Sequence, residues 1–288
     1  MILRLDVLKE VGERALGDLG RRVKDSVKGL VSGTGHVVEG TADAVRGAVV
    51  GTLRGAGDVA RAATGAAADA VTGALEAVGD VGESAVSVAK GAVVGVIKGV
   101  GEVTTVTAGV LSDTVRAAIK GTKGVGVEAT EAVSGLVEGA ITATKDTAVS
   151  IEDAAVGAAQ GAIRGAKDIG VDLVDTAKAA TGASIKGAQE IGGDAIGALC
   201  STARGLVTGA GDVVGDVAGV TRGAIVGAVQ TARDVGISAE EAASAVATGA
   251  LQAAEEIGGG AVDAVTGVTA ETIEGVKAVV KKPFSQGD

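Results

Sequence analysis

Apolar and polar residues recur along the chain in an 11-residue pattern. When each 11-residue half is lettered a to k, with Val45 as the first a, positions a, d, e, h and i are apolar in nearly every half. Positions b, c, f and j are polar or glycine. A helix with this period advances by about 98° per residue, so the apolar positions share one arc of about 130°. The pattern predicts an amphipathic α-helix, because a strand would require strict alternation.

Pairs of halves form a 22-residue unit, which is marked by two recurring phrases. Gly57-Asp58-Val59 returns in related forms at whole multiples of that unit, and the phrase Gly47 to Gly55 returns at Gly91 to Gly99 and Gly157 to Gly165. A β-coil or a solenoid of helices would need a turn in every unit, and turns favour Asn, Pro and Gly-Asp clusters. The chain has no Asn and one proline, Pro283, which argues against both.

We therefore predict an all-α fold whose main element is a very long amphipathic hendecad-repeat helix over residues 23–280. The phase of the repeat holds across the glycine cluster 258–260, where an inserted loop would break it. A continuous rod of this length would extend about 390 Å at 1.5 Å per residue. The alternative is a few long helical segments that fold back at the glycine clusters. Two non-repeat parts flank the rod: an N-terminal helical segment, 1–22, and a C-terminal tail, 281–288.

Such a helix needs a surface on which to fold. Each interior glycine costs about 1 kcal/mol relative to alanine, and valine and threonine add smaller penalties. The apolar arc is wide but built from small side chains, mostly alanine and valine. We expect that either a lipid surface or other copies of the chain supply the order.

Two sets of residues are predicted to make these contacts. Glycines at a spacing of four let helix backbones approach closely, and the helix-packing set is Gly47, Gly51, Gly55, Gly91, Gly95, Gly99, Gly157, Gly161 and Gly165. Basic residues beside the apolar arc suit a lipid headgroup layer, and this edge comprises Lys90, Lys123, Lys145, Lys167, Arg222 and Arg233. The alternative for the charges is a solvated face of a coiled coil, with pairs at a spacing of four such as Lys98/Glu102 and Arg164/Asp168.

Composition argues against enzyme chemistry. The chain has 49 glycines, one phenylalanine and no tryptophan or tyrosine, whereas a conventional enzyme core needs large side chains to fill its volume. His36 and Cys200 are the only residues of their types, so neither has a partner for catalysis or for metal binding. Acidic residues at the same letter of successive halves would lie about 16 Å or more from each other on a rod. We expect no enzyme, cofactor, metal or small-molecule substrate.

Charge and hydropathy restrict the partners and the location. The net charge of −10 argues against nucleic acid, which requires a basic surface. Charges interrupt every apolar run, and a membrane span needs about 20 mostly apolar residues. The start, Met1 to Asp6, lacks the features of a secretory leader. We expect a cytoplasmic protein peripheral to a membrane or lipid body, with no signal peptide and no transmembrane helix.

Three stretches resemble known proteins with 11-residue repeats. Residues Ile257 to Lys281 resemble the Gly-Ala-Val-Thr-rich repeats of synucleins, and Lys120 to Val125 is similar to their lysine-threonine-lysine phrase. Residues Glu138 to Thr147 are similar to the repeat of perilipin lipid-droplet coats, and late embryogenesis abundant proteins share the period. The resemblance lies in period and composition over most of the chain. It implies a flexible chain that becomes helical on lipid or on drying.

Three functional hypotheses follow. The first is a non-enzymatic structural protein whose long amphipathic helix coats a lipid or membrane surface, with glycine ridges packing its neighbours side by side. The second is a self-assembling helical filament or coiled-coil scaffold whose apolar stripe is buried in protein. The third is a desiccation or stress protectant that is disordered in water. The chain is more acidic and richer in glycine than the lipid binders it resembles, which favours helix packing or neutral lipid over anionic membranes.

Overall fold

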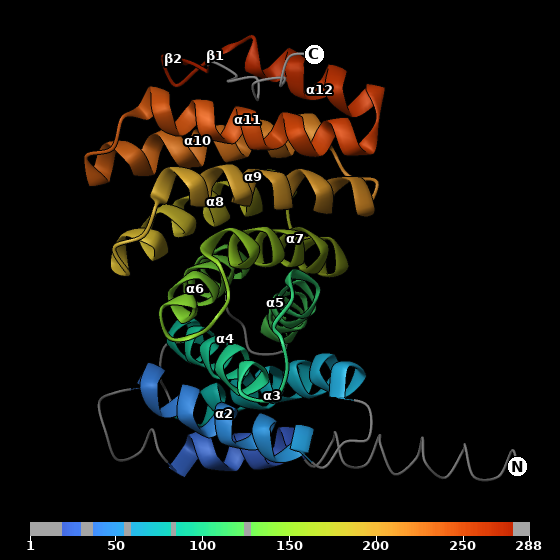
Figure 1. The fold of residues 1–288 in the computed structure, drawn as a ribbon, viewed down its shortest axis with the longest axis vertical. Helices are drawn as coiled ribbons and strands as arrows, with labels where there is room; N and C mark the ends of the chain where they lie inside the picture. Colours follow the sequence, from blue (N-terminus) through green and yellow to red (C-terminus); the bar gives the residue numbers. More distant parts are fainter. Residues whose placement is uncertain (1–18, 30–36, 55–58, 82–84, 124–127, 279–288) are drawn as a thin grey trace, which may run out of the picture.

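The 22-residue unit folds as one helix followed by a short connection, and successive units stack along the long axis of the molecule (Figure 1). The computed structural model describes residues 19–29, 37–54, 59–81, 85–123 and 128–278. Within these ranges, residues 19–29 are helical. The helices that follow are α2 (Val37–Arg54), α3 (Val59–Val81), α4 (Ala85–Gly101), α5 (Ala108–Thr122), α6 (Ala129–Thr142), the 3₁₀ helix η1 (Ala143–Asp146), α7 (Ile151–Ile169), α8 (Leu173–Glu190), α9 (Ala195–Asp212), α10 (Val217–Val235), α11 (Ala239–Ile257) and α12 (Gly259–Thr269).

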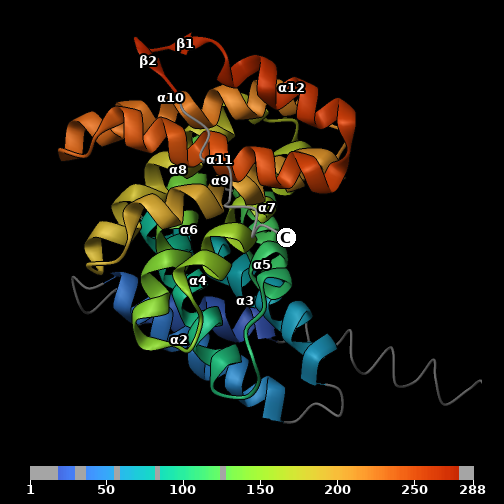
Figure 2. The same ribbon diagram turned by 45° about the horizontal axis from the view of Figure 1, so that its top comes forward.

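The helices form two layers. Even-numbered helices pack on one another in the order α2, α4, α6, α8, α10, and odd-numbered helices do so in the order α3, α5, α7, α9, α11 (Figures 1 and 2). The contacts advance in step along both members of a pair: Gly91 of α4 lies on Val38 of α2 and Gly95 lies on Ala42. Helices two units apart are therefore parallel, and each chain neighbour lies in the other layer.

The prediction of one very long helix is wrong, and the chain does not fold into a few long segments either. The described helices α2 to α12 contain between 11 and 23 residues each. The coarser prediction, an all-α fold, is confirmed apart from one short hairpin in the described part, β1 (Thr272–Ile273) with β2 (Val276–Lys277). Turns divide the predicted rod into short helices. Contrary to our expectation from the sequence, these turns need neither asparagine nor proline.

Glycine ends the helices and a short polar side chain begins them. Gly170, Gly192 and Gly236 occupy the same place in three different units and adopt the left-handed conformation, with φ of 77°, 68° and 76°, which costs glycine little. Two residues after each of these glycines comes the residue that caps the next helix. The side-chain caps at this place in the unit are Ser150, Asp172, Asp194, Asp216 and Ser238. Asp172, for example, accepts hydrogen bonds from the amides of Val174 and Asp175 at 2.7 and 3.1 Å.

The turn belongs to the repeat, which explains why the phase never breaks. A turn inserted into a rod would shift the positions that follow it. A turn present in every 22-residue unit keeps the count constant, so the 11-residue lettering runs through it unchanged. Phase continuity is thus compatible with a helix-turn stack as well as with a rod.

The apolar arc of each helix forms the core between the layers. Its largest fully buried side chains include Ile163 of α7, Leu206 of α9 and Ile225 of α10, and most of the remainder is alanine and valine. Small side chains fill this core because the helix backbones approach closely at glycines, so little volume remains between them. Of the described residues, only Val214 and Ile257 are large exposed apolar side chains.

Candidate functional surfaces

Glycine ridges seal the stack by backbone-to-backbone contact. A Cβ atom added at Gly157 of α7 would lie 2.5 Å from the carbonyl oxygen of Ala108 and 2.8 Å from the Cβ of Leu111, both on α5. Gly161 and Gly165 continue this contact along α5, and Gly91, Gly95 and Gly99 of α4 make the equivalent contact with α2. No side chain larger than hydrogen fits at these positions without movement of a neighbouring backbone.

The partner of a ridge glycine follows a simple rule. From α6 onward, the backbone that faces each ridge glycine lies two units and five positions earlier in the chain, so that Gly135 faces Val86 and Gly249 faces Cys200. The rule also covers ridge glycines outside the predicted helix-packing set, namely Gly135, Gly139, Gly187, Gly205, Gly209, Gly223, Gly227 and Gly249. Their spacing of four and their fixed place in the unit were visible in the sequence, but the identity of the partner was not.

The first ridge of the helix-packing set differs from the others. Gly47 and Gly51 lie on α2, are exposed, and have no atom within 4 Å of an added Cβ. Gly55 lies outside the described residues. The structure therefore places six of the nine predicted glycines in close contact within one chain and leaves two open at the end of a layer.

Ion pairs join helices two units apart. Arg116 of α5 donates two hydrogen bonds to Asp168 of α7, from Nε at 2.6 Å and from Nη2 at 3.0 Å. Ion pairs between successive helices continue up this layer, where Arg164 pairs with Asp212 at 2.6 Å and Arg204 with Glu256 at 2.6 Å. The acid belongs to the recurring Gly-Asp-Val phrase and stands in the last turn of its helix or beside it. A carboxylate there is disfavoured by the helix dipole, and the base from the neighbouring helix offsets that penalty.

These pairs replace the predicted pairs at a spacing of four. Lys98 binds Asp146 at 2.7 Å and not Glu102, which instead lies 3.4 Å from Arg46. Arg164 likewise binds Asp212 and not Asp168. The spacing of four places charges on one helix face, but a base in a stacked helix also reaches the acid of the next helix in its layer.

Lys90 joins three helices of the even layer. Its ammonium on α4 lies 2.6 Å from Glu138 of α6 and 3.1 Å from Glu190 at the end of α8. Burial alone would lower the pKa of Lys90, but hydrogen bonds and attraction from the two carboxylates outweigh it, so the pKa is raised. This lysine was predicted to lie at a lipid interface, and here it is part of a salt-bridge network.

The other residues of the predicted basic edge are distributed over several helices. Arg222 of α10 pairs with Glu271 at 2.8 Å, and Arg233 donates a hydrogen bond to the carbonyl oxygen of Glu274 in the hairpin at 2.6 Å. Lys123 follows α5, Lys145 lies in η1 and Lys167 lies in the last turn of α7, and all three are exposed. In a stack of short helices, residues that share one letter of the repeat no longer form one continuous line.

Aspartates at the same letter of the repeat differ in the direction in which the structure shifts their pKa. The Arg116 hydrogen bonds hold the pKa of Asp168 below its usual value, and Lys98 does the same for Asp146. Desolvation instead raises the pKa of Asp69 on α3, which has no ion pair with another described residue. The pKa of an aspartate is thus lowered where a base of a neighbouring helix binds it and is raised where burial acts without such a bond.

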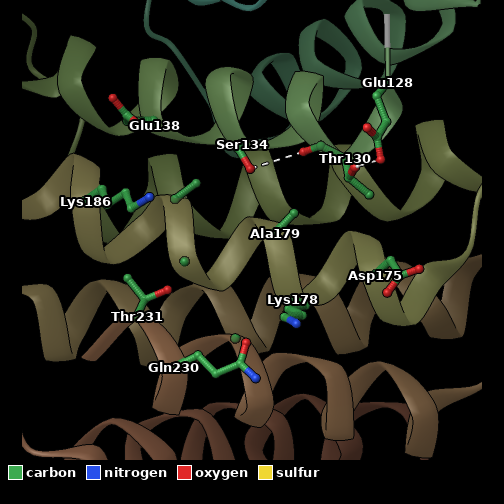
Figure 3. Close-up of a pocket in the computed structure, with 13 residues that line it drawn as sticks. Glu128, Thr130, Ser134, Glu138, Asp175, Lys178, Ala179, Lys186, Gln230 and Thr231 are labelled. Carbon is green, nitrogen blue, oxygen red and sulfur yellow. Dashed lines mark hydrogen bonds between the residues drawn. The ribbon is translucent and has the colours of Figure 1, made fainter. Parts of the chain in front are cut away.

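A groove lined by charged, hydroxyl-bearing and small residues crosses the even layer at α6, α8 and α10 (Figure 3). It has a volume of about 480 Å³ and is hollowed where Ala179, Gly182 and Gly227 carry little or no side chain. Two of its hydroxyl groups are engaged locally: Ser134 donates to the carbonyl oxygen of Thr130, and Thr130 donates to Glu128. Lys178, Lys186 and Asp175 also line it. The groove offers hydrogen bonds and charges of both signs to a partner surface, but no nucleophile beside a base.

Of the two residues considered for catalysis or metal binding, the structure describes only Cys200. His36 lies outside the described residues. Cys200 on α9 is half-buried, and burial raises the pKa of its thiol. The described part of the chain contains no group of three histidine, cysteine or acidic side chains arranged to hold a metal ion.

Comparison with known proteins adds no relatives. No protein-family model matches the chain, and no curated protein is detectably similar to it. Among the helices that the structure describes, none combines the length and the apolar character needed to cross a bilayer.

Proposed function

We propose that the protein is a non-enzymatic helical scaffold whose apolar stripe is buried within its own two-layered stack. The observation that carries the proposal is the burial of the apolar stripe. The apolar arcs of α4 to α11 face one another, and only Val214 and Ile257 remain as large exposed apolar side chains in the described part. A lipid coat needs that stripe to be available to lipid. A repeat stack instead uses it for nearest-neighbour contacts, and leaves its faces for partners.

The contacts between units also support a scaffold. Ridge glycines and ion pairs join helices two units apart in both layers, so each unit is held by the unit two before it and the unit two after it. Repeats joined in this way form an elongated body (Figure 1), and the groove over α6, α8 and α10 lies on one of its faces. The residues that line the groove carry both signs of charge, which suits a protein partner.

Far-UV circular dichroism in buffer, and then with neutral and anionic vesicles, tests this function. The scaffold predicts strong helicity in buffer and no gain with either lipid. Helix that forms only with lipid would favour the coat. A chain that is disordered in buffer and helical only on drying would favour the protectant.

The variant Gly161→Ala distinguishes the scaffold from the lipid coat, because the two hypotheses predict opposite effects of the substitution on the stability of the helix. In the stack, the new methyl group would meet the backbone of Ser112, so thermal stability should fall. On a lipid surface the same residue would lie beside the apolar arc of a single helix, where alanine raises helix propensity by about 1 kcal/mol. A variant that is more helical than the wild type, with or without lipid, would contradict the scaffold.

A further inference from the structure

The outward face of α2 has the helix-packing ridge of the repeat, but no helix of the described part of the chain lies on that ridge. Gly47 and Gly51 stand two units before Gly91 and Gly95, which occupy the same places in the repeat. The ridge of α4 lies on the backbone of α2, whereas an added Cβ at Gly47 or Gly51 meets nothing within 4 Å. Val50, on the same face, is only half-buried. This is the packing face that every later even helix from α4 to α10 uses against its neighbour.

The opposite end of the same layer is covered. α12 and the β1–β2 hairpin lie over α10 (Figure 2). Arg222 and Arg233 of α10 are bound there to Glu271 and Glu274. A head-to-tail assembly would need the α10 face to be free. The open ridge of α2 is therefore suited to a partner that presents the same ridge, in a two-fold arrangement.

Charges on α2 fit that arrangement. Asp43 and Arg54 are exposed, and neither forms an ion pair with another described residue. At about 100° per residue, Asp43, Gly47 and Arg54 lie within an arc of about 40°. If two copies of α2 cross antiparallel about a point level with Val49, Gly47 of one copy faces Gly51 of the other. The same register places Asp43 of each copy opposite Arg54 of the other, so the pattern is self-complementary.

We propose that α2 is a docking face for a second copy of this chain, which joins two stacks end to end about a two-fold axis. The glycines allow the two α2 backbones to approach closely, as they do within the stack, and two symmetric Asp43–Arg54 ion pairs set the register. The proposal rests on the scaffold function in one respect: the chain must fold without lipid.

Sedimentation of the full-length chain in buffer with about 50 mM salt tests the docking face, because ion pairs of exposed groups are weakly screened there. The wild type should sediment as a dimer that weakens with salt. Arg54→Asp and Asp43→Arg should each weaken dimerisation about tenfold or more, because each sets like charges against each other. The double variant Asp43→Arg/Arg54→Asp exchanges the charges and should restore the dimer.

The controls separate this proposal from the scaffold function. All three variants change exposed side chains, so their circular dichroism should match that of the wild type. A fully helical monomer, or a dimer that both single variants leave intact, overturns the docking face and leaves the scaffold standing. A double variant that stays as weak as the single ones also overturns it. A chain that is disordered in buffer overturns both proposals.

Discussion

Helices α2 and α4 contain almost the same phrase in two different surroundings. The letters GAVVGTLR begin at Gly47 of α2, and GAVVGVIK begins at Gly91 of α4. In α4 the two glycines lie against the backbone of α2, whereas in α2 the equivalent glycines face open space. A repeated sequence thus sets the shape of a unit, but its place in the stack decides whether a given glycine is required. Equivalent positions with different surroundings are therefore the natural place to test the fold.

The largest difference is expected between Gly95→Ala and Gly51→Ala. A methyl group on Gly95 would meet the carbonyl oxygen of Ala42 and lie 2.8 Å from the Cβ of Val45. Overpacking of this kind should lower the free energy of unfolding by about 1–3 kcal/mol. At Gly51, where no atom of the same chain is near, alanine should raise it by about 0.5–1 kcal/mol in monomeric protein at high salt, because glycine loses more backbone entropy in a helix. Urea unfolding followed by circular dichroism measures both.

The decisive result is whether Gly95→Ala and Gly51→Ala change the free energy of unfolding in opposite directions. If both alanine variants were stabilised, α4 would not lie on α2 as described. If both were destabilised, the Gly51 face would be in contact with something, and sedimentation of that variant would show whether the contact is a second copy.

A second pair compares two turns. Val214 adopts φ 50°, the left-handed conformation that Gly236 adopts one unit later with φ 76°. Such a conformation costs a residue with a side chain about 1–2 kcal/mol. Gly236→Ala should therefore lower the free energy of unfolding by about 1 kcal/mol or more. Val214→Gly should raise it by several tenths of a kcal/mol, because relief of strain exceeds the added entropy of the unfolded chain. Val214 is 93% exposed, so little apolar burial is lost.

Thermal unfolding of the two turn variants in one buffer is sufficient. Gly170→Ala, at a third turn with φ 77°, is the matched control and should behave like Gly236→Ala. Destabilisation by Val214→Gly would mean that the valine side chain makes a contact absent from this structure.

The sequence alone carried the helical class and the apolar arc, because both depend on local periodicity. It did not carry the division into short helices, because the absence of asparagine and the single proline argue against a turn in every unit, whereas Gly170 and Asp172 form such a turn. The signal was present as a glycine followed two residues later by Asp or Ser, at the same place in several 22-residue units. The partner of Gly157 and the Arg116–Asp168 pair could not be predicted, because they join residues more than two units apart. Those contacts exist only once the stack sets the step between successive helices of one layer.

The smallest expected effect compares two aspartates at the same letter of the repeat. Asp168 is held by Arg116 and its pKa is lowered, so its contribution to stability is present above the usual aspartate pKa of about 4 and is lost as the pH falls through the lowered value. Asp69 has a pKa raised by desolvation, so it destabilises the fold once the pH rises through that raised value.

At about pH 7, Asp168→Asn should lower the free energy of unfolding by at most about 1 kcal/mol, and Asp69→Asn should raise it slightly. Near pH 3 both differences should shrink, because the ordinary aspartate is then mostly protonated. Urea unfolding at both pH values measures this, and effects of equal sign would contradict the assignment of one paired and one unpaired acid.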